Sequence, residues 1–592
     1  MTNLYSPWVQ RAIRFLRNMF HALFVFFPGF IFLFLTMVAF WNLSQGEDLM
    51  VLATEQKMFF IYFELLLAFL VLVSWYAARI VANAKKTSPN TAPDYLDEKY
   101  YTHIPRFIGF SFFTVILLAF AQTPFFFQIN VPGWIFYALL LLSVPYYKWL
   151  SKIFTKRFKV IKLNKLFYIT VGIILVGSIV LTYNIGQYTW PVLVLMVLML
   201  LILQASFLVL VITRREMIER KEREGKPQDK PVNQLAIKSA DLARLPHEEI
   251  NFHFGFLVIS VIALLIYLGC TLSIPFSVRL GSFSFVLLAF AVFLGVGFIL
   301  SFISIRVGLN IHFIVLFFIF LFGQWTERHH VALVEKDAAI TDSFSNKAGL
   351  QDYFLKWVQD RDSLISQSSE FPVYFVLSDG GASRSGYWVA SVLGKLEDTS
   401  ARSFSRHLFC LSGASGGSVG NAAFYALLHD AGPRPRLSNN QDFYQAGKEY
   451  LRSDFLSYTL SRMLGHDFFV QALPFNTSGD RAKAPTDALV RAPAHDVLLK
   501  SKLAAPLSAF SIYKGKERSD LPVLCNNATR MQDGQPSVIS TIDIDPVIFN
   551  NRVDVLKKLQ KGKDMKLSTA VVLGASFPYV SPAGGIDDLK AL

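Results

Sequence analysis

Residues 408–420 of this chain read LFCLSGASGGSVG, and this stretch decides the fold of the C-terminal half. Residues 407–413, HLFCLSG, form a continuous apolar run of the kind found in buried strands. Residues 418–428, SVGNAAFYALL, place small residues first and apolar residues after, which predicts a helix. Between the two lies the pattern G-x-S-x-G, centred on Ser415. We therefore expect Ser415 in a tight strand-to-helix turn.

Such a turn exposes the serine hydroxyl at the edge of a sheet, as in serine hydrolases. Gly413 and Gly417 flank the serine and let neighbouring backbones approach closely, which makes them the predicted nucleophile elbow. The N-terminus of the following helix favours negative charge beside Ser415. A glycine turn without chemistry can spell the same pattern, but the strand before it and the helix after it favour a catalytic nucleophile.

A second strand, turn and helix precede the first set in the chain. Residues 372–377, PVYFVL, predict a buried parallel strand, and residues 388–396 predict a helix. The turn between them begins SDGGASRSG at residue 378. Main-chain N–H groups at such a turn can hold a phosphate or the oxyanion of an acyl-transfer intermediate. A dinucleotide-binding motif is disfavoured, because the second glycine of that fingerprint is missing.

The motifs SDGGASRSGYW and LSGASGGSVG, in this order, resemble the patatin-like phospholipase family, in its membrane-anchored bacterial form. The segments DRA at 480–482, PVLCNNATRMQDGQ at 522–535 and LGASFPYVSPAGG at 573–585 resemble further parts of bacterial members. The resemblance covers the chain from residue 371 onward. It implies a three-layer α/β hydrolase domain with a mostly parallel sheet, and a serine esterase that cleaves glycerolipids without a metal or cofactor.

The resemblance also implies a role for each residue of the two motifs. Ser415 would be the nucleophile, and the glycine-rich loop would supply the amides of the oxyanion hole. Arg384 would steady that loop or meet a substrate phosphate, and Ser383 stands where the family often has glycine. The residues of the implied oxyanion loop are Gly380, Gly381, Ala382, Ser383 and Arg384.

The general base of the family is an aspartate in an Asp-Gly-[Gly/Ala] motif that follows the ASFP segment, here residues 575–578. Only Asp587 and Asp588 follow that segment in this sequence, and neither precedes a glycine. Asp533 does precede a glycine, but it lies before ASFP in a predicted hairpin turn. We expect a sequence cut short before the catalytic aspartate. Recruitment of Asp588 and a degenerate enzyme are the alternatives.

A histidine-based triad is a further alternative. Asp430 or Asp454 combined with His466 or His495 would satisfy the chain order Ser…Asp…His of an α/β-hydrolase. Adjacent histidine and aspartate side chains rarely face each other, so solvated loops are the competing interpretation. The three His-Asp dipeptides after Ser415 are His429-Asp430, His466-Asp467 and His495-Asp496.

The first half of the chain has the composition of a membrane protein. Of 592 residues, 53% are hydrophobic and 17% are charged, whereas soluble domains carry about 25% charged residues. We expect a multi-pass domain at 1–325, a polar connector with one amphipathic helix at 326–370, and the hydrolase domain at 371–592. Nine apolar runs are long enough to cross about 30 Å of hydrocarbon, at residues 19–40, 58–76, 107–127, 134–150, 166–183, 188–213, 252–272, 282–305 and 311–325.

The net charge of +14 points to cytoplasmic loops rather than to nucleic acid, because basic loops mark the cytoplasmic side of membrane proteins. Basic loops precede the first span and follow the second, fourth and sixth, which predicts a cytoplasmic N-terminus in a bacterial inner membrane. Nine spans would place the hydrolase domain outside, and one miscounted span would return it to the cytoplasm. Both positions are open.

The sequence therefore predicts a membrane-bound lipid acyl hydrolase whose partner is a membrane lipid. Its three cysteines are widely spaced and form no metal or disulfide pattern. The alternative is a membrane transporter or scaffold with a degenerate, lipid-binding domain. A carboxylate inside a span, Glu64, would belong to a transport pathway or would pair with a neighbouring helix.

Overall fold

In the computed structural model the chain divides into two compact units, which are described one at a time. Unit 1 consists of Met1–Cys270 and Arg279–Gln324, and unit 2 consists of Thr271–Val278 and Trp325–Leu592. The structure describes residues 7–42, 44–55, 57–89, 91–92, 94–123, 126, 132–157, 163–184, 186–187, 189–224, 234–242, 245, 249–323, 329–338, 340, 342–467, 481–491, 497–510, 512–576 and 584–586.

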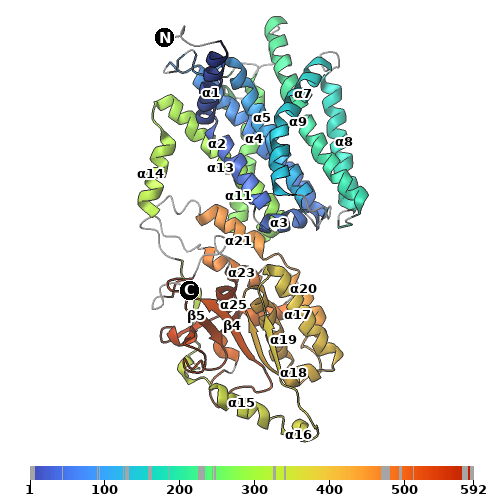
Figure 1. Ribbon diagram of the computed structural model, residues 1–592, viewed down its shortest axis with the longest axis vertical. Helices are drawn as coiled ribbons and strands as arrows, with labels where there is room; N and C mark the ends of the chain where they lie inside the picture. The colour runs from blue at the N-terminus through green and yellow to red at the C-terminus, as the bar shows by residue number, and fades with distance from the viewer. Residues whose placement is uncertain are drawn as a thin grey trace. The chain divides into compact units, whose positions relative to one another are not determined.

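Unit 1 is helical, and five of its described helices contain segments long and apolar enough to cross a membrane (Figure 1). A pair of helices bent by 81°, α1 (Pro7–Val25) and α2 (Phe27–Met37) with its continuation η1 (Val38–Asn42), forms a sixth candidate span. The chain is therefore a multi-pass membrane protein. The five helices are α4 (Lys57–Lys86), α5 (Glu98–Gln122), α9 (Trp190–Glu224), α11 (Ile250–Leu272) and α13 (Ser282–Val307).

The remaining predicted runs also lie on helices, but the apolar segments that the structure describes on them are shorter. They correspond to α7 (Gly133–Arg157), α8 (Leu163–Asn184) and α14 (Ile311–Gly323). The apolar part of α7, for example, ends at the exposed Lys148. The count of nine spans therefore stays a prediction. Three further short helices lie in the described residues: α3 (Ser44–Glu55), α10 (Gln234–Leu242) and α12 (Ile274–Leu280), which crosses the boundary between the units.

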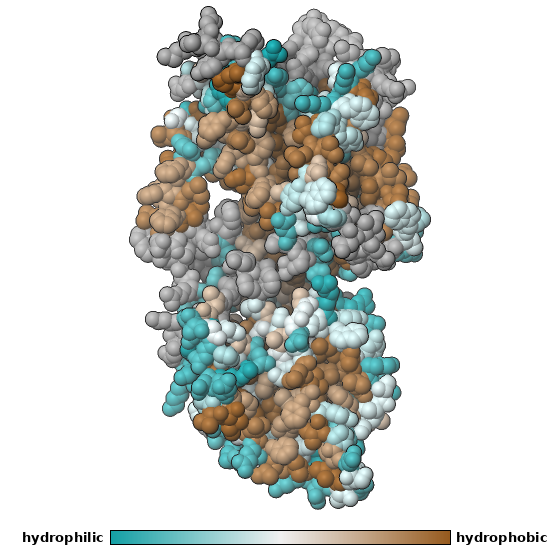
Figure 2. Space-filling model, viewed as in Figure 1, coloured by the Kyte–Doolittle hydropathy of each residue, from teal (hydrophilic) through white to brown (hydrophobic). Residues whose placement is uncertain are grey.

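Apolar side chains lie both inside and outside unit 1, as a lipid solvent permits. The interior is rich in phenylalanine, and the rings of Phe63 and Phe283 stack at 4.9 Å between their centroids. On the outer surface, Leu265 of α11 and Phe320 of α14 are more than half exposed. Figure 2 shows apolar side chains over much of this surface.

Unit 2 contains a five-stranded, mostly parallel sheet in the order β2-β3-β4-β5-β6. Three of its four pairings are parallel, and the pairing of β4 with β5 is antiparallel. The predicted parallel strands and the predicted hairpin turn around Asp533 are confirmed. The strands are β2 (Tyr374–Ser378), β3 (Leu408–Gly413), β4 (Val523–Thr529), β5 (Pro536–Ser540) and β6 (Val553–Asp554), and a separate antiparallel pair consists of β1 (Leu333–Glu335) and β7 (Lys563–Met565).

Residues on the two faces of this sheet belong to different cores, because neighbouring residues on a strand point to opposite sides. Leu524 belongs to the larger core, which includes the helix after β3, whereas Val523 belongs to a smaller core with Trp357. Trp357 lies on an amphipathic helix within the segment expected to be a connector. That segment is part of unit 2 and covers one face of the sheet.

The predicted helices of unit 2 are present, with shifted ends. The helix expected at 388–396 begins six residues earlier, because the periodic apolar pattern marks only its later turns. The helices are α15 (Leu350–Gln359), α16 (Asp362–Ile365), α17 (Ala382–Thr399), α18 (Ser403–His407), α19 (Gly416–Ala431), α20 (Phe443–Leu451), α21 (Leu456–Arg462), α23 (Ala484–Arg491), α24 (Val497–Ala504) and α25 (Leu567–Ala575), with single turns at η3 (Phe344–Asn346), η4 (Met463–Asp467), η5 (Arg481–Lys483), η6 (Leu507–Phe510) and η7 (Leu556–Lys558).

Candidate active site

Ser415 lies between the end of β3 and the start of α19, as the motif predicts. Its backbone has φ 52° and ψ −129°, a conformation that strains any residue with a side chain. Hydrogen bonds hold the turn: the N–H of Ser415 donates to the carbonyl of Gly574 at 2.9 Å, and the N–H of Ala414 donates to that of Ser378 at 3.0 Å. The surrounding structure therefore imposes the strained conformation on the serine.

The glycines of the turn are required by close contacts between backbones. A Cβ on Gly417 would lie 2.4 Å from the carbonyl oxygen of Ser378, and one on Gly413 would lie 2.8 Å from the side-chain nitrogen of Asn421. Gly416, which the motif did not single out, is the most constrained, because its Cβ would lie 1.9 Å from a carbonyl oxygen of α17. No larger residue fits at these three positions without a backbone shift.

The glycine-rich loop lies directly against the serine. A Cβ on Gly380 would be 3.0 Å from the Cβ of Ser415 and 3.5 Å from its Oγ. The hydroxyl of Ser385 donates to the carbonyl of Asp379 at 2.6 Å and closes the loop on itself. The two motifs, far apart in the sequence, thus meet at one edge of the sheet.

Two helices begin at this edge and pack against each other through glycines. A Cβ on Gly420 of α19 would lie 2.7 Å from the carbonyl oxygen of Gly386 of α17, and one on Gly386 would lie 3.1 Å from that of Gly416. The unpaired N–H groups and the dipoles of both helix N-termini favour negative charge at this point. The sequence did not predict that Gly386 and Gly420 form this helix contact. The small residues at the start of both helices are the signal that could have indicated it.

The loop residues from Gly380 to Arg384 are exposed, and Ser415 is half-buried. The Oγ of Ser415 and the N–H groups of Gly380, Gly381 and Gly416 form no hydrogen bond with any described residue. The arrangement therefore places a partly exposed hydroxyl at the same edge of the sheet as several main-chain N–H groups that have no acceptor among the described residues.

No protein-family model, curated protein or solved structure matches this chain. The chemistry of the site is therefore argued from its own geometry. Among the described residues no group of three metal-binding side chains occurs, and all three cysteines are free. The hydrogen bond between Cys410 and Cys525 on neighbouring strands, together with burial, raises the pKa of the Cys410 thiol.

Asn527 of β4 supports the elbow from behind, and the motifs did not reveal it. Its side-chain amide donates to the carbonyl of Gly413 at 3.0 Å and to the hydroxyl of Ser412 at 2.9 Å, and its oxygen accepts from Arg552 at 3.2 Å. The next strand of the sheet thereby fixes the end of β3. Only the parallel pairing of β3 with β4 brings these residues together.

Asp588, the weak candidate for the general base, lies outside the described residues, as does Asp587. Asp533 is described and lies at the turn of the β4–β5 hairpin, where it pairs with Arg530. Hydrogen bonds from Arg530 and from the N–H of Gln535 lower the pKa of Asp533 to about 2. A carboxylate held this firmly in its charged form is a poor proton acceptor near neutral pH.

The geometry separates the first His-Asp dipeptide from the candidate nucleophile. His429 lies near the C-terminus of α19, whereas Ser415 lies at its N-terminus. Fourteen residues of helix at 1.5 Å each place them about 21 Å apart. His429 therefore cannot accept a proton from Ser415.

The carboxylates of the histidine alternative are engaged elsewhere. Asp430 accepts from the N–H and hydroxyl of Ser438, and Asp454 accepts from the N–H groups of Leu456 and Ser457 at the start of α21, the helix that follows it. The His466 ring contacts the neighbouring Asp467 carboxylate at 3.2 Å. His495 and Asp496 lie outside the described residues.

Proposed function

We propose that this protein is a membrane-bound lipid acyl hydrolase of the patatin-like type, with Ser415 as its nucleophile. The observation that carries the proposal is the strained, half-buried Ser415, with Gly380 so near that a Cβ on it would lie 3.0 Å from the serine Cβ. Strain at a non-glycine residue persists where function requires it. The membrane spans supply the second argument, because they hold the enzyme in the phase where its substrate is dissolved.

In the proposed reaction, the Ser415 oxygen attacks the ester carbonyl of a glycerolipid. The carbonyl oxygen becomes negative and accepts hydrogen bonds from the free N–H groups of Gly380, Gly381 and Gly416. The bond to the glycerol oxygen then breaks, the serine proton passes to that oxygen, and an acyl-serine ester remains. Water hydrolyses this ester, releases a fatty acid and returns the proton to Ser415.

The test compares fatty-acid release from glycerolipid vesicles by the purified full chain and two variants. Ser415→Ala should lower the rate by a factor of about 1,000 or more, as loss of a nucleophile does in serine hydrolases. Ser418→Ala is the matched control, because this buried serine lies on the helix that follows Ser415 and its hydroxyl has no hydrogen-bond partner among the described residues. It should retain full activity.

A fluorophosphonate probe gives a second readout that does not depend on the choice of lipid. Labelling of the chain that Ser415→Ala abolishes supports the nucleophile. If Ser415→Ala is labelled as strongly, or is as active, as Ser418→Ala, the assignment of Ser415 as the nucleophile is overturned. Lipid binding without any labelling of the parent chain would favour the transporter or scaffold hypothesis instead.

A further inference from the structure

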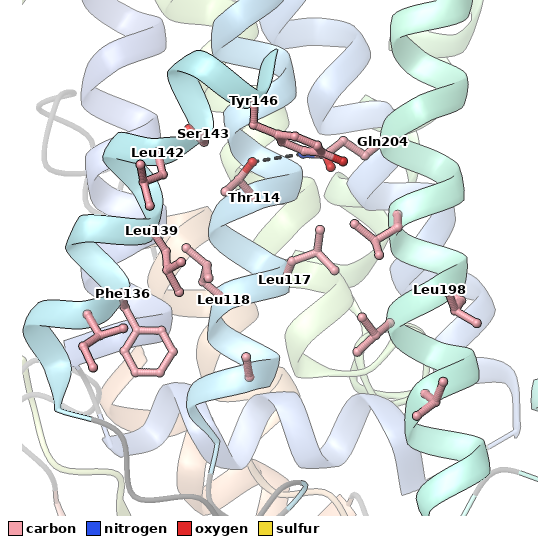
Figure 3. A pocket seen from close by; sticks show the side chains of 15 residues that line it. Thr114, Leu117, Leu118, Phe136, Leu139, Leu142, Ser143, Tyr146, Leu198 and Gln204 are labelled. Atoms are coloured by element: carbon pink, nitrogen blue, oxygen red, sulfur yellow. Dashed lines mark hydrogen bonds between the residues drawn. The ribbon is translucent and has the colours of Figure 1, made fainter. Parts of the chain in front are cut away.

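A cavity of about 750 Å³ lies among three helices of unit 1, α5, α7 and α9. Its volume falls in the range of roughly 300–1,000 Å³ that is typical of small-molecule sites. Leu117 and Leu118 of α5, Leu139 of α7 and Leu198 of α9 belong to its apolar wall (Figure 3). No charged residue is among the residues that line it.

One end of the cavity is polar. Figure 3 shows Thr114, Tyr146 and Gln204 together at this end, each from a different helix. The side-chain amide of Gln204 is almost fully buried and donates to the Thr114 hydroxyl at 2.9 Å and to the carbonyl of Phe110 at 3.2 Å. The Gln204 oxygen and the Tyr146 hydroxyl form no hydrogen bond with any described residue.

These two groups are therefore an acceptor and a donor available to an occupant. A buried acceptor in hydrocarbon is costly when no donor reaches it. A hydroxyl group on the occupant satisfies both, because it donates to the Gln204 oxygen and accepts from Tyr146. A phosphate would be buried here without any lysine or arginine on the wall, which is unfavourable.

The length of the cavity matches one acyl chain. Its wall on α9 runs from Val194 to Gln204, about 15 Å at 1.5 Å per residue. This is half of the roughly 30 Å hydrocarbon core, so the wall is about as long as one acyl chain. Lipid can reach the cavity from the side, because Leu142 and Leu198 of its wall are about half exposed.

We propose that this cavity binds one lipid with an acyl chain along the leucine wall and an uncharged, hydroxyl-bearing head of the monoacylglycerol type against Tyr146 and Gln204. The assignment is independent of the proposed chemistry at Ser415, because it uses only residues of unit 1. It concerns a binding site, and no reaction takes place there.

The test uses the full chain in lipid nanodiscs and a monoacylglycerol with a photoreactive diazirine in its acyl chain. Labelling of peptides from α7 or α9 should saturate, and unlabelled monoacylglycerol should compete. Leu198→Trp should reduce labelling at least ten-fold by filling the cavity. Leu265→Trp, a lipid-exposed leucine of α11, is the matched control and should have no effect.

Gln204→Leu tests the polar end and should weaken binding about five-fold, the loss expected for one hydrogen bond. Thermal unfolding of each variant shows whether it is folded. If Leu198→Trp does not fold, Gln204→Leu and the competition decide. Labelling that does not saturate, that survives Leu198→Trp, or that a phospholipid probe reproduces equally would show bulk lipid only and would overturn the proposal.

Discussion

Ser415 has a backbone conformation that residues with a side chain adopt only under constraint, at a cost of about 1–3 kcal/mol. The constraint comes from the hydrogen bond of its N–H to Gly574 and from the packing of Gly416 and Gly417. The turn thus stores strain that the rest of unit 2 must offset. The Cβ of Ser415, rather than its hydroxyl, is the source of this strain.

This origin of the strain yields a prediction at Ser415. Ser415→Gly should raise the free energy of unfolding of unit 2 by about 1 kcal/mol, because glycine adopts this φ without a clash. Ser415→Ala keeps the Cβ and should leave stability unchanged. Urea unfolding of the purified chain, followed by near-ultraviolet circular dichroism, measures both. Ala423→Gly on the same helix should instead lower stability by about 1 kcal/mol, and a similar loss in Ser415→Gly would contradict the prediction.

At this scale, the sequence predicts some residues and cannot predict others. Ser415 could be recognised because strand, turn and helix are contiguous, and each has its own local pattern. Asn527 supports the same turn from more than a hundred residues away, and only strand pairing connects the two. In the sequence, Gly416 and Gly420 cannot be distinguished from other small residues, because their role depends on the contact with α17.

At the scale of elements, α17 and α19 bring the two motifs together. Their contact runs through glycines, so the backbones approach more closely than helices with larger side chains allow. The positions of both helix N-termini, and with them the free N–H groups at Ser415, depend on this contact. The helix–helix contact therefore links packing to the geometry of the candidate site.

Gly420→Ala tests this contact. The added Cβ would lie 2.7 Å from the carbonyl oxygen of Gly386 and 2.7 Å from the Cβ of Val389, so the helices must separate. We expect a loss of about 1–3 kcal/mol in unfolding free energy and a parallel loss of fluorophosphonate labelling. Gly447→Ala is the control, since its Cβ would meet the nearest atom, on Ala390, at 3.4 Å. Equal effects of the two substitutions would refute the role of the contact.

His429, near the C-terminal end of α19, should make the stability of unit 2 depend on pH. Burial and the nearby Lys502 and Arg518 lower the pKa of His429 to about 4, against the smaller opposing effects of Asp520 and Asp430. The unfolded histidine has a pKa near 6.5. Between these values the unfolded chain binds more protons, so stability falls as pH drops below about 6.5.

For this partly exposed histidine the loss should be on the order of 1–2 kcal/mol between pH 7 and pH 4, after allowance for solvent screening. His429→Gln removes the titrating group and should flatten this part of the profile. Unfolding free energies at pH 7, 6, 5 and 4 for both proteins give the measurement. An unchanged slope in His429→Gln would assign the pH dependence to other groups.

At the scale of the whole molecule, the sequence separates an apolar, multi-pass half from an α/β half. Composition is sufficient for this step, because segments that face lipid are much more apolar than segments that face water. Prediction from composition reaches its limit in the segment 326–370, which has the polar composition of a connector. Two of its residues, Tyr353 and Trp357, are buried against the sheet, and Lys347 reaches the interior. Polarity averaged over a segment conceals such isolated buried anchors.

Lys347 provides the prediction at this scale. Its ammonium group is fully buried, 2.7 Å from the carboxylate of Asp554, and donates to the carbonyl of Ser540 at 3.0 Å. This ion pair ties the segment before the sheet to strands β5 and β6. Lys347→Met would leave Asp554 charged and unpaired, and should lower the unfolding free energy of unit 2 by about 3–5 kcal/mol.

The double variant Lys347→Met/Asp554→Leu should recover most of that loss, because no buried charge is left without a partner. Lys514→Met is the matched control: its pair with Asp352 is about half exposed, so its loss should leave the unfolding free energy nearly unchanged. Urea unfolding of the four proteins decides the matter. If the double variant is as unstable as Lys347→Met, the pair holds unit 2 together through packing of the lysine stem rather than through charge.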